Sequence, residues 1–494
     1  MLLDFNDITD STQLDADLVI VGSGPAGLTL ALSMVKSNLS VLVIESGGLE
    51  PDQRVQDFNK GENLGQKYFP LHRCRSRYFG GSSNCWAGWC APLDESDFQQ
   101  HDWIPDSGWP ITYEDLRPYY EKAQTLLELN DKDFMPNTWR RKGAPIWSLG
   151  KDFETRVYKF SPPTRFGKLY RDELRQSKNI KCLLNASVTQ INLSTNGTRV
   201  DNLTVQHSLG KKTMRVTGKT VVLAAGGLEN PRLLLNSTQH SPNGIANEYD
   251  VVGRYFMEHP HLHSEGRFYR THGMPSIKLY TRHSYQDQII KAYLRIPPKL
   301  RTERKLLNLS MCIEPVRRTT ISKAHRSLME TTAETDGKRL KLNKKKQPML
   351  LSCDLRSEQV PNRESRISLS DDRDALGLRR AQLDWRLSEI DKASMRATQL
   401  YFAKRLMGQR WSRFLLRLDE TPTFSKRLKG GCHHMGTTRI SDSPRTGVVD
   451  QNLKVHGIDN FYIAGSSTFP TGGAANPTLT IVALSLRLAE QLKG

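Results

Sequence analysis

The sequence lacks the features that mark membrane, exported and repeat proteins. It contains no run of eighteen or more apolar residues, so we expect no membrane-spanning helix. Residues 1–7 are acidic and show none of the charged, apolar and small-residue regions of a signal peptide. Internal repeats and low-complexity tracts are also missing. With 494 residues and a 37% apolar fraction, the chain is expected to fold as a globular protein of two or more domains.

Cysteine is scarce and badly placed for cross-linking. Of the seven cysteines, only Cys85 and Cys90 lie close together, and no pair has the spacing of a structural zinc site. We interpret these two as buried thiols, expect no disulfide framework and predict a reducing cytoplasm as the location. His259 and His261 have a metal-like spacing, but no third ligand is apparent. We therefore predict no metal site and give both histidines a structural role.

Acidic residues are too few to balance the basic ones. The formal net charge is +19, and residues 301–350 hold thirteen Lys and Arg against five Asp and Glu. A second basic stretch covers residues 404–429. Neither stretch has interleaved aromatics or a nucleic-acid-binding motif, so we expect a solvated surface and no nucleic-acid partner. A basic surface also favours an acidic partner.

A strand–turn–helix–strand pattern opens the chain. Residues 17–21 and 40–44 are short β-branched apolar runs typical of buried parallel strands, and residues 28–35 form an apolar helix pattern between them. The sequence G-x-G-x-x-G occupies the turn at residues 22–27, and Glu45 ends the second strand. This order predicts a Rossmann-like dinucleotide-binding unit.

Each glycine of that turn has a separate expected role. Gly22 permits the tight turn, Gly24 lets the backbone approach a pyrophosphate, and Gly27 lets helix and strand pack closely. The phosphate would then lie on the helix N-terminus, where unpaired N–H groups favour an anion. Glu45, eighteen residues after Gly27, is placed to accept hydrogen bonds from ribose hydroxyls.

Two further glycine-rich segments are expected near the same ligand. In residues 79–89, paired glycines and small polar residues would let backbone pass close to a flat ligand between two tryptophans. A tight turn before a core tryptophan explains this segment equally well. Residues 219–227 repeat the strand–glycine pattern before another helix. The cofactor-binding candidates from these segments are Gly81, Ser82, Asn84 and Ala225.

The middle of the chain changes from alternating strands and helices to clustered strands. We expect a helix over residues 110–129 with Thr112 as its cap, and a basic helix from residue 390 to about 414. The predicted strands between the two are residues 308–313, 349–355, 366–369 and 381–387. Strands that cluster in this way predict an antiparallel sheet and a second domain.

The C-terminal sixty residues combine a histidine among glycines with an Asn-Pro-Thr that opens an apolar helix. His433 and Asn476 would face a base and an amide toward one point. His433 could instead be structural, and Asn476 could only cap the helix. His434 is expected to point away from that site and to pack or hydrogen-bond elsewhere.

Taken together, five segments resemble the glucose–methanol–choline (GMC) oxidoreductase family, and more its pyranose oxidase and fructose dehydrogenase branch than glucose oxidase. They are GSGPAG with Glu45, GGSSNCW, AAGGLENPRLLL with VGRYFMEHP, HHMGTTR, and the C-terminal VVDQNLKVHGIDNFYIAGSSTFPTGGAANPTLTIVAL. The resemblance implies a discontinuous FAD-binding domain and a substrate domain over the flavin. For this α/β fold we expect residues 1–110, 175–261 and 430–494 in the FAD-binding domain, and 111–174 and 262–429 in the largely antiparallel substrate domain.

The resemblance also assigns site residues. His433 matches the active-site histidine, and Asn476 matches its partner, which is asparagine in the pyranose oxidase branch. Where pyranose oxidases carry a flavin-linking histidine this chain has Cys85, so we expect noncovalent FAD. Further residues matching segments near the flavin are Gly465, Pro477 and Thr478.

Alcohol oxidation would require a specific chemical role from each of these residues. His433 would take the hydroxyl proton, Asn476 would orient the hydroxyl, and the helix N-terminus after it would stabilise negative charge on the flavin. We predict oxidation of a secondary hydroxyl of a sugar or glycoside, with dioxygen, a quinone or a carrier protein as acceptor. The alternatives are a non-sugar alcohol such as a steroid or specialised metabolite, and a flavin electron-transfer protein docking an acidic partner or membrane. An NAD(P)-linked dehydrogenase would have no use for the C-terminal segments.

Overall fold

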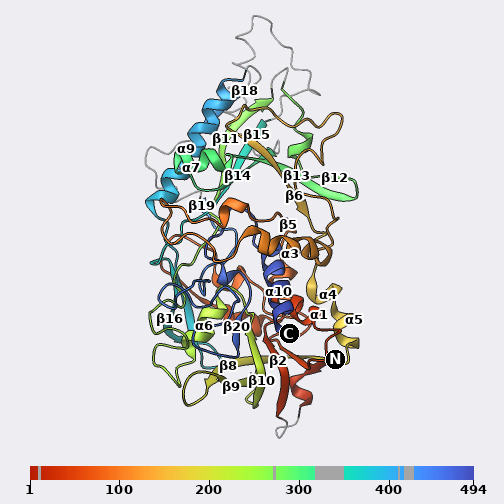
Figure 1. The fold of residues 1–494 in the computed structure, drawn as a ribbon, viewed down its shortest axis with the longest axis vertical. Coiled ribbons are helices and arrows are strands. Elements are labelled where there is room, and N and C mark those ends of the chain that lie inside the picture. Colours follow the sequence, from red (N-terminus) through yellow and green to blue (C-terminus); the bar gives the residue numbers. More distant parts are fainter. Residues whose placement is uncertain (9–12, 271–273, 317–349, 410–411, 417–427, 494) are drawn as a thin grey trace, which may run out of the picture.

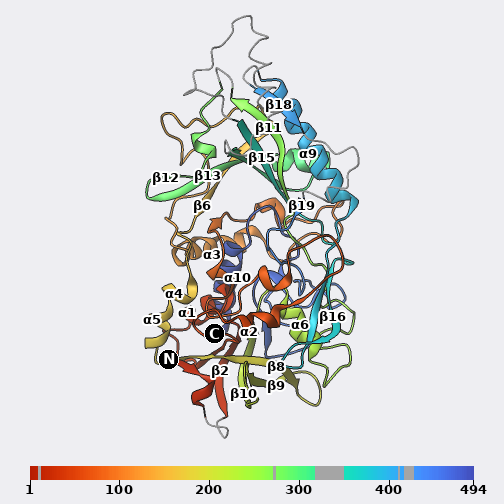
Figure 2. The ribbon, with the colours of Figure 1, turned by 180° about the vertical axis from the view of Figure 1, so that it is seen from behind.

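The computed structural model describes residues 1–8, 13–270, 274–316, 350–409, 412–416 and 428–493. Most of the basic segment 301–350, and part of the stretch 404–429, lie outside these residues. Within them, two large sheets lie one above the other along the long axis of the molecule, with helices between them (Figures 1 and 2). No helix in the described ranges is both long and apolar enough to cross a membrane.

The lower sheet has a parallel part and an antiparallel part. Its parallel strands are β1 (Leu2–Asp4), β7 (Ile180–Leu184), β3 (Val41–Ile44), β2 (Leu14–Val21), β10 (Thr213–Leu223) and β20 (Phe461–Ile463). Antiparallel pairing from β10 through β9 (Val200–His207) to β8 (Ala186–Leu193) completes it. Strands β2 and β3 are nearly fully buried where they pair, as expected of a parallel sheet covered on both faces. The predicted Rossmann-like architecture is confirmed.

Three helices cover this sheet on the side of the upper layer. Helix α10 (Thr478–Leu492) packs against both α1 (Pro25–Ser33) and α3 (Tyr113–Leu126), and all three share one hydrophobic core with the sheet. Thr112 caps α3 as predicted, because its hydroxyl accepts from the backbone N–H of Asp115, whose carboxylate accepts in return. The shorter helices are α2 (Gln53–Gln56), α4 (Phe166–Leu169), α5 (Arg171–Gln176), α6 (Glu229–Asn236) and α7 (Pro298–Arg304).

The upper sheet is antiparallel throughout, as predicted. Its strands are β18 (Ser412–Leu416), β11 (His261–Arg270), β15 (Leu350–Ser357), β14 (Leu309–Pro315), β13 (Gln288–Arg295), β6 (Glu154–Phe160) and β5 (Trp89–Cys90), with β12 (His283–Tyr285) on β13 and β19 (Leu428–Lys429) on β11. Helix α9 (Glu389–Met407) lies along one side of it (Figure 1). The expected helix to residue 414 is too long, because it ends at Gly408 and residues 412–416 pair with β11 instead.

A small third sheet joins β16 (Arg366–Arg373) and β17 (Arg379–Asp384) to β4 (Gly61–Asn63). The expected division of the chain into two domains stays a prediction, and two segments bear on it. Strand β5, from the first segment of the expected FAD-binding domain, pairs with β6 of the upper sheet. Helix α3, from the expected substrate domain, packs in the core of the lower sheet. The chain therefore crosses between the two layers more often than the predicted boundaries suggest.

Candidate active site

A cavity of ≈570 Å³ runs between the two layers. One end is bounded by the carboxyl ends of β2, β3 and β10, and the other by the loops that carry His433 and Asn476. In open parallel sheets, ligands bind beyond the carboxyl ends of the strands, so this is where a dinucleotide is expected. The sequence thus folds to bring its N-terminal and C-terminal motifs onto one cavity.

The glycine turn between β2 and α1 has the geometry that its sequence predicts. Gly22 has φ +105°, and a Cβ there would lie 2.6 Å from the carbonyl oxygen of Ala224. A Cβ on Gly27 would lie 1.9 Å from the carbonyl oxygen of Gly22, so helix and turn touch directly. A Cβ on Gly24 would meet no atom within 4 Å, and Gly24 lines the cavity. The turn therefore leaves room for a ligand at the N-terminus of α1, which has no side-chain cap.

Glu45 is fixed beside this turn. Its Oε2 accepts from the backbone N–H of Ser23 at 3.1 Å and from the Ser23 hydroxyl at 2.6 Å. Its Oε1 accepts from the backbone N–H of Gly47 at 2.9 Å. The carboxylate is buried in the protein and lines the cavity at the end of β3. These bonds fix the orientation of the group that the sequence assigns to a ribose.

The remaining cofactor candidates divide into two groups. Asn84 does not line the cavity; its amide donates to the carbonyl of Phe79 and ties down the 3₁₀ turn Gly81–Asn84. The sequence could not show this, because a side chain that holds its own turn has the same local pattern as one that faces a ligand. Those that line the cavity are Gly81, Ser82, Ala225, Gly465, Pro477 and Thr478.

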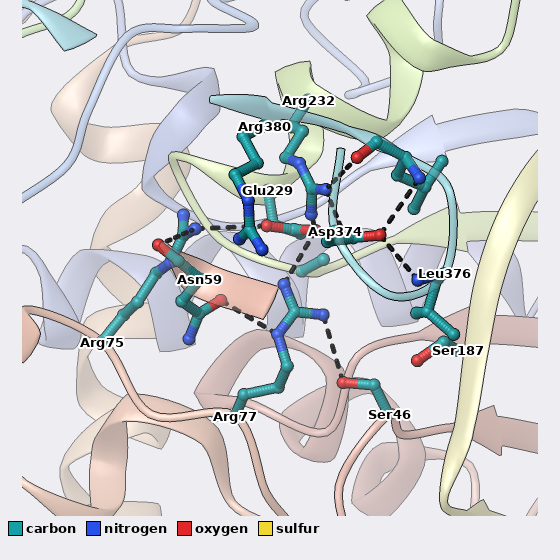
Figure 3. Close-up of polar contacts among 12 residues, drawn as sticks. Ser46, Asn59, Arg75, Arg77, Ser187, Glu229, Arg232, Asp374, Leu376 and Arg380 are labelled. Atoms are coloured by element: carbon teal, nitrogen blue, oxygen red, sulfur yellow. Dashed lines mark hydrogen bonds and ion pairs between the residues drawn. The ribbon is translucent and has the colours of Figure 1, made fainter. Parts of the chain in front are cut away.

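A buried cluster of arginines and carboxylates forms the cavity wall beside Ser46, the residue after Glu45 (Figure 3). Arg77 and Arg232 reach Glu229 from opposite sides, with nitrogen–oxygen distances of 2.8 Å each. Arg232 also pairs with Asp374 at 2.5 Å, and Arg75 lies 3.4 Å from Glu229. The cluster ties α6 to the loop before Gly80 and to the β16–β17 turn. This cluster is not predictable from the sequence, because it joins three segments that are far apart in the chain.

This cluster holds one more positive charge than negative. Burial raises the pKa of Glu229, but the Arg77, Arg232 and Arg75 guanidinium groups outweigh it and hold that pKa well below its usual range. Burial lowers the pKa of Arg75 to about 10, and its Nε and Nη1 have no hydrogen-bond partner in the described part of the protein. The Nε–H and Nη1–H groups of Arg75 therefore remain available at this wall of the cavity to donate to a ligand.

At the other end of the cavity, strand-like pairing places His259 opposite His433. Met257 and Met435 exchange two backbone hydrogen bonds of 3.0 Å as an antiparallel bridge. Two residues after Met257 and two residues before Met435, on the same face of the bridge, the His259 and His433 side chains meet, and their Nδ1 atoms lie 2.8 Å apart. The structural role predicted for His259 is therefore incomplete, because its ring contacts the catalytic candidate.

A chain of hydrogen bonds fixes which nitrogen of His433 carries a proton. The carbonyl of Gly472 lies 3.2 Å from His259 Nε2 and can only accept, so Nε2 carries the proton of neutral His259. His259 Nδ1 is then bare and must accept from His433 Nδ1–H. His433 Nε2 is left unprotonated, and its lone pair accepts a hydrogen bond from Asn476 Nδ2–H at 2.9 Å.

The neutral state that this chain requires is favoured by burial. Burial lowers the pKa of His259 to about 4. Burial, followed by the proximity of His259, His261 and Arg356, lowers the pKa of His433 well below its usual range. Both rings are therefore uncharged at neutral pH, and His433 presents an acceptor at Nε2.

Glu258 braces the loop that carries His433. Its two oxygens accept from the backbone N–H groups of Gly431, His433 and His259, each at 2.9 Å, and from the Tyr68 hydroxyl. Burial raises the pKa of this carboxyl to about 7, although all four donors favour its charged form. His434 lies on the far side, where Nε2 is 3.0 Å from the Tyr68 hydroxyl. As predicted, the His434 ring hydrogen-bonds elsewhere than at Asn476, although His434 also lines the cavity.

Asn476 is not the cap of the last helix. Pro477 occupies the N-cap position of α10 without a side-chain bond, and the Asn476 amide turns to His433 instead. Asn476 Oδ1 is buried without a partner in the described residues. Both atoms of the amide head are thus directed at the site and not at the helix backbone.

The cysteines near the cavity differ in exposure. Cys90 is fully buried, as predicted, whereas Cys85 is exposed and lines the cavity, so the expectation of a buried thiol there is wrong. Cys85 follows the 3₁₀ turn, whose chain direction brings it to the cavity wall. In the described residues no group of three or more His, Cys, Asp or Glu could hold a metal ion.

Comparison with known proteins decides the family. Two models described as GMC oxidoreductase match residues 169–261 and 361–485, and the second range contains both His433 and Asn476. The chain belongs to the GMC oxidoreductase family. It is an oxidoreductase that acts on CH–OH groups and uses FAD.

Full-length relatives of this GMC oxidoreductase include two curated dehydrogenases. The large subunit of fructose dehydrogenase from Gluconobacter japonicus is 24% identical, over 97% of this chain and 98% of the relative. The 2-methyl-1,2-propanediol dehydrogenase of Mycolicibacterium austroafricanum is 23% identical, over 96% and 95%. Pyridoxine 4-oxidase from Mesorbium loti shares the fold, with a TM-score of 0.60 at 17% identity and coverage of 96% and 98%.

The cavity of this GMC oxidoreductase fits FAD. The space beside Gly24 and the uncapped start of α1 suit a pyrophosphate, and Glu45 is fixed next to them. The same cavity continues to His433, Asn476 and the N-terminus of α10, where a flavin ring would lie. Gly22, Gly24, Gly27 and Glu45 could be found from sequence because their pattern is local.

Proposed function

We propose that this GMC oxidoreductase oxidises a secondary hydroxyl of a sugar or sugar-like substrate to a ketone, with His433 as the base. The observation that carries the proposal is the bare Nε2 of His433, which faces the cavity beside the amide of Asn476. A substrate hydroxyl would replace the hydrogen bond between Asn476 and His433, donating its proton to Nε2 and accepting a hydrogen bond from Asn476 Nδ2. The bound FAD supplies the hydride acceptor for the carbon–hydrogen bond of the alcohol.

Neighbouring groups would support proton transfer to His433. Once protonated, the ring carries N–H on both nitrogens, and His259 Nδ1 continues to accept from Nδ1–H without rearrangement. The backbone N–H of His433 donates to Glu258. This bond holds the backbone to which the ring is attached, and so helps to position the ring against the hydroxyl. Positioning of this kind accounts for much of what an enzyme adds to a cofactor.

The start of α10 would act on the cofactor. Pro477 and Thr478 line the cavity, and the N-terminus of α10 has no side-chain cap. Its unpaired N–H groups and dipole favour negative charge on a flavin ring placed there. We assign the phosphate to Gly24 and Gly81, and the ribose to Glu45, because these residues line the opposite end of the cavity.

Both the sugar assignment and its rival have support. Fructose dehydrogenase, named for a sugar, aligns over nearly the whole chain. A dehydrogenase named for the small diol 2-methyl-1,2-propanediol aligns almost as fully, so a non-sugar alcohol is the second candidate. The flavin electron-transfer protein is disfavoured, because it would have no need for the bare Nε2 of His433.

FAD is proposed to be bound noncovalently. The position that carries a flavin-linking histidine in pyranose oxidases is Cys85 here, and this thiol lines the cavity. Acid precipitation of the holoenzyme should release all of the flavin into the supernatant. Flavin retained in the pellet, and released from a Cys85→Ser variant, would show a thioether link instead. We further propose a reducing cytoplasm as the location, which agrees with seven free cysteines.

The test of the proposed function is an anaerobic titration of the holoenzyme with sugars, glycosides and simple alcohols, followed by absorbance. Bleaching of the oxidised flavin band by a sugar is the expected result. Dioxygen is then admitted: rapid recovery identifies an oxidase, and slow recovery identifies a dehydrogenase that needs a quinone or a carrier protein. Bleaching by non-sugar alcohols alone would contradict the sugar assignment.

A further inference from the structure

Arg356 lies on the substrate side of the cavity, close to the proposed base. It pairs with His261 across β15 and β11, so the two side chains project from the same face of the upper sheet. Both residues line the cavity, and the His261 ring centroid lies 5.8 Å from that of His433. The upper sheet therefore directs a guanidinium group toward the place where a substrate would meet His433.

Two neighbours hold this guanidinium without neutralising it. Its Cζ lies 4.2 Å from the ring centroid of Trp89, which also lines the cavity. Its Nη1 donates to the sulfur of Cys312 at 3.0 Å. Burial lowers the pKa of Arg356, but neighbours that include Cys312 and Asp354, two residues away on β15, raise it overall. Among the described residues no carboxylate forms an ion pair with Arg356. Arginine carries five N–H donors in a planar fork, so most of its donors are left for a ligand.

Two other arginines in the interior of this protein are paired with carboxylates. Arg232 pairs with Asp374 and Glu229, and Arg295 pairs with Asp94 and Glu154. A buried charge is costly unless it is paired, and the fold meets that requirement at these two positions. Arg356 is partly buried and opens onto the cavity without such a partner. Among the described residues Arg439, which packs on Tyr255, also has no carboxylate partner, but it does not line the cavity.

The position of Arg356 also carries a cost for catalysis. Its charge adds to burial in lowering the pKa of His259, His261 and His433, so it opposes protonation of the base. A bound anion would cancel this charge during turnover. We propose that Arg356 binds a carboxylate or phosphate group carried by the sugar-like substrate. The inference rests on the proposed function and narrows its substrate class to anionic sugars and glycosides.

Two features agree with an anionic substrate. Trp89 lines the cavity beside the guanidinium, so apolar indole surface is available there for contact with a sugar ring or an aromatic aglycone. The formal net charge of +19 would also raise the local concentration of anions and speed their association at low salt.

The experiment compares matched substrates in anaerobic reduction of the holoenzyme. The pairs are D-glucose against D-glucuronate, D-glucose against D-glucose 6-phosphate, and phenyl β-D-glucoside against 4-carboxyphenyl β-D-glucoside. The concentration that half-saturates flavin reduction should be roughly tenfold or more lower for the anionic member of at least one pair. The pair that shows the preference identifies the anion as carboxylate or phosphate.

Three variants assign the preference to Arg356. Arg356→Gln should abolish it, and Arg356→Lys, which keeps the charge but loses the fork, should retain part of it. Arg304→Gln removes an equal charge from an exposed position on α7 and should keep the full preference. FAD content and thermal unfolding of each variant show whether the fold is intact.

A reaction-independent measurement separates this inference from the proposed function. Benzoate and inorganic phosphate are titrated into the oxidised holoenzyme, and the perturbation of the flavin absorbance is followed. At least one anion should bind, roughly tenfold or more weaker in Arg356→Gln. Equal anion binding in wild type and Arg356→Gln, or no binding in wild type, overturns the inference even if sugars reduce the flavin. If anions bind through Arg356 but no sugar reduces the flavin, the proposed function fails while the anion site stands.

Discussion

The Nδ1 atoms of His259 and His433 lie 2.8 Å apart, and this contact sets the tautomer of the proposed base. Only one of two neutral imidazoles can donate in such a pair, and the carbonyl of Gly472 makes His259 the acceptor. His259 is thus a positioning residue for proton transfer.

The first prediction follows from this contact. In His259→Ala the proton of His433 can move to Nε2, so flavin reduction should slow about 10- to 100-fold in stopped-flow measurements, with little change in half-saturation. His263→Ala is the matched control, because His263 is exposed on the neighbouring strand. Equal rates in His259→Ala and wild type would show that the tautomer does not depend on His259.

The second prediction concerns pH. The base must be uncharged, so the reduction rate falls as pH drops through the pKa of His433. Burial lowers that pKa well below its usual range, so the acid limb should lie below about pH 6.5 and the rate should be flat above it.

Arg356 contributes to that shift, so its removal should move the acid limb to higher pH. The comparison uses a neutral alcohol, because an anionic one would itself offset the charge. An acid limb at the same pH in wild type and Arg356→Gln would show that the charge of Arg356 does not lower the pKa of His433.

The third prediction concerns the arginine cluster beside Ser46. Glu229→Gln would leave Arg75, Arg77 and Arg232 facing one carboxylate, that of Asp374, in a buried site. We predict a loss of about 3–5 kcal/mol in the free energy of unfolding, together with weaker FAD retention. Urea unfolding and flavin content measure both quantities.

Glu364→Gln provides the control for that substitution. Glu364 is exposed and pairs with Arg254, so its loss should change stability by no more than about 1 kcal/mol. Similar losses in the free energy of unfolding for the two variants would mean that the buried cluster contributes no more to stability than an exposed ion pair.

The fourth prediction concerns the dependence of stability on pH. Burial, reinforced by their proximity to neighbouring carboxylates, raises the pKa of Asp97 to about 6 and that of Glu358 to about 8. Both groups hold protons more tightly in the folded than in the unfolded chain. Below about pH 6.5 the lowered pKa values of buried histidines such as His259 and His433 act in the opposite direction. Stability should therefore fall as pH rises from about 6.5 to 8, where the folded state binds more protons.

Glu358→Gln should remove much of that slope, because Glu358 titrates at its upper end. Thermal unfolding at a series of pH values measures it. An unchanged slope in this variant would assign the pH dependence to other groups.

Much of the fold could be predicted from local patterns. Three of its features depend only on residues close together in the sequence. They are the capping box at Thr112, the glycine turn at Gly22, Gly24 and Gly27, and the helix that begins at Thr478. Local patterns also placed His433 and Asn476 on one cavity, with the help of the family resemblance.

What the sequence did not reveal depends on long-range contacts. His259 meets His433 only because Met257 bridges Met435, and Arg356 reaches the cavity only through its register with His261. Neither pairing leaves a periodic signal in the sequence. The spacing of His259 and His261 is visible in the sequence, but without a third ligand it predicts only a structural role and not a contact with the base.

The most direct test of the account is single-turnover flavin reduction in His433→Ala, with a sugar that reduces the wild-type flavin. Loss of the bare Nε2 should slow reduction by about 10²- to 10⁴-fold, while flavin content and spectrum match those of the wild type. A His433→Ala variant that retains its flavin and is reduced at the wild-type rate would contradict the assignment of His433 as the base.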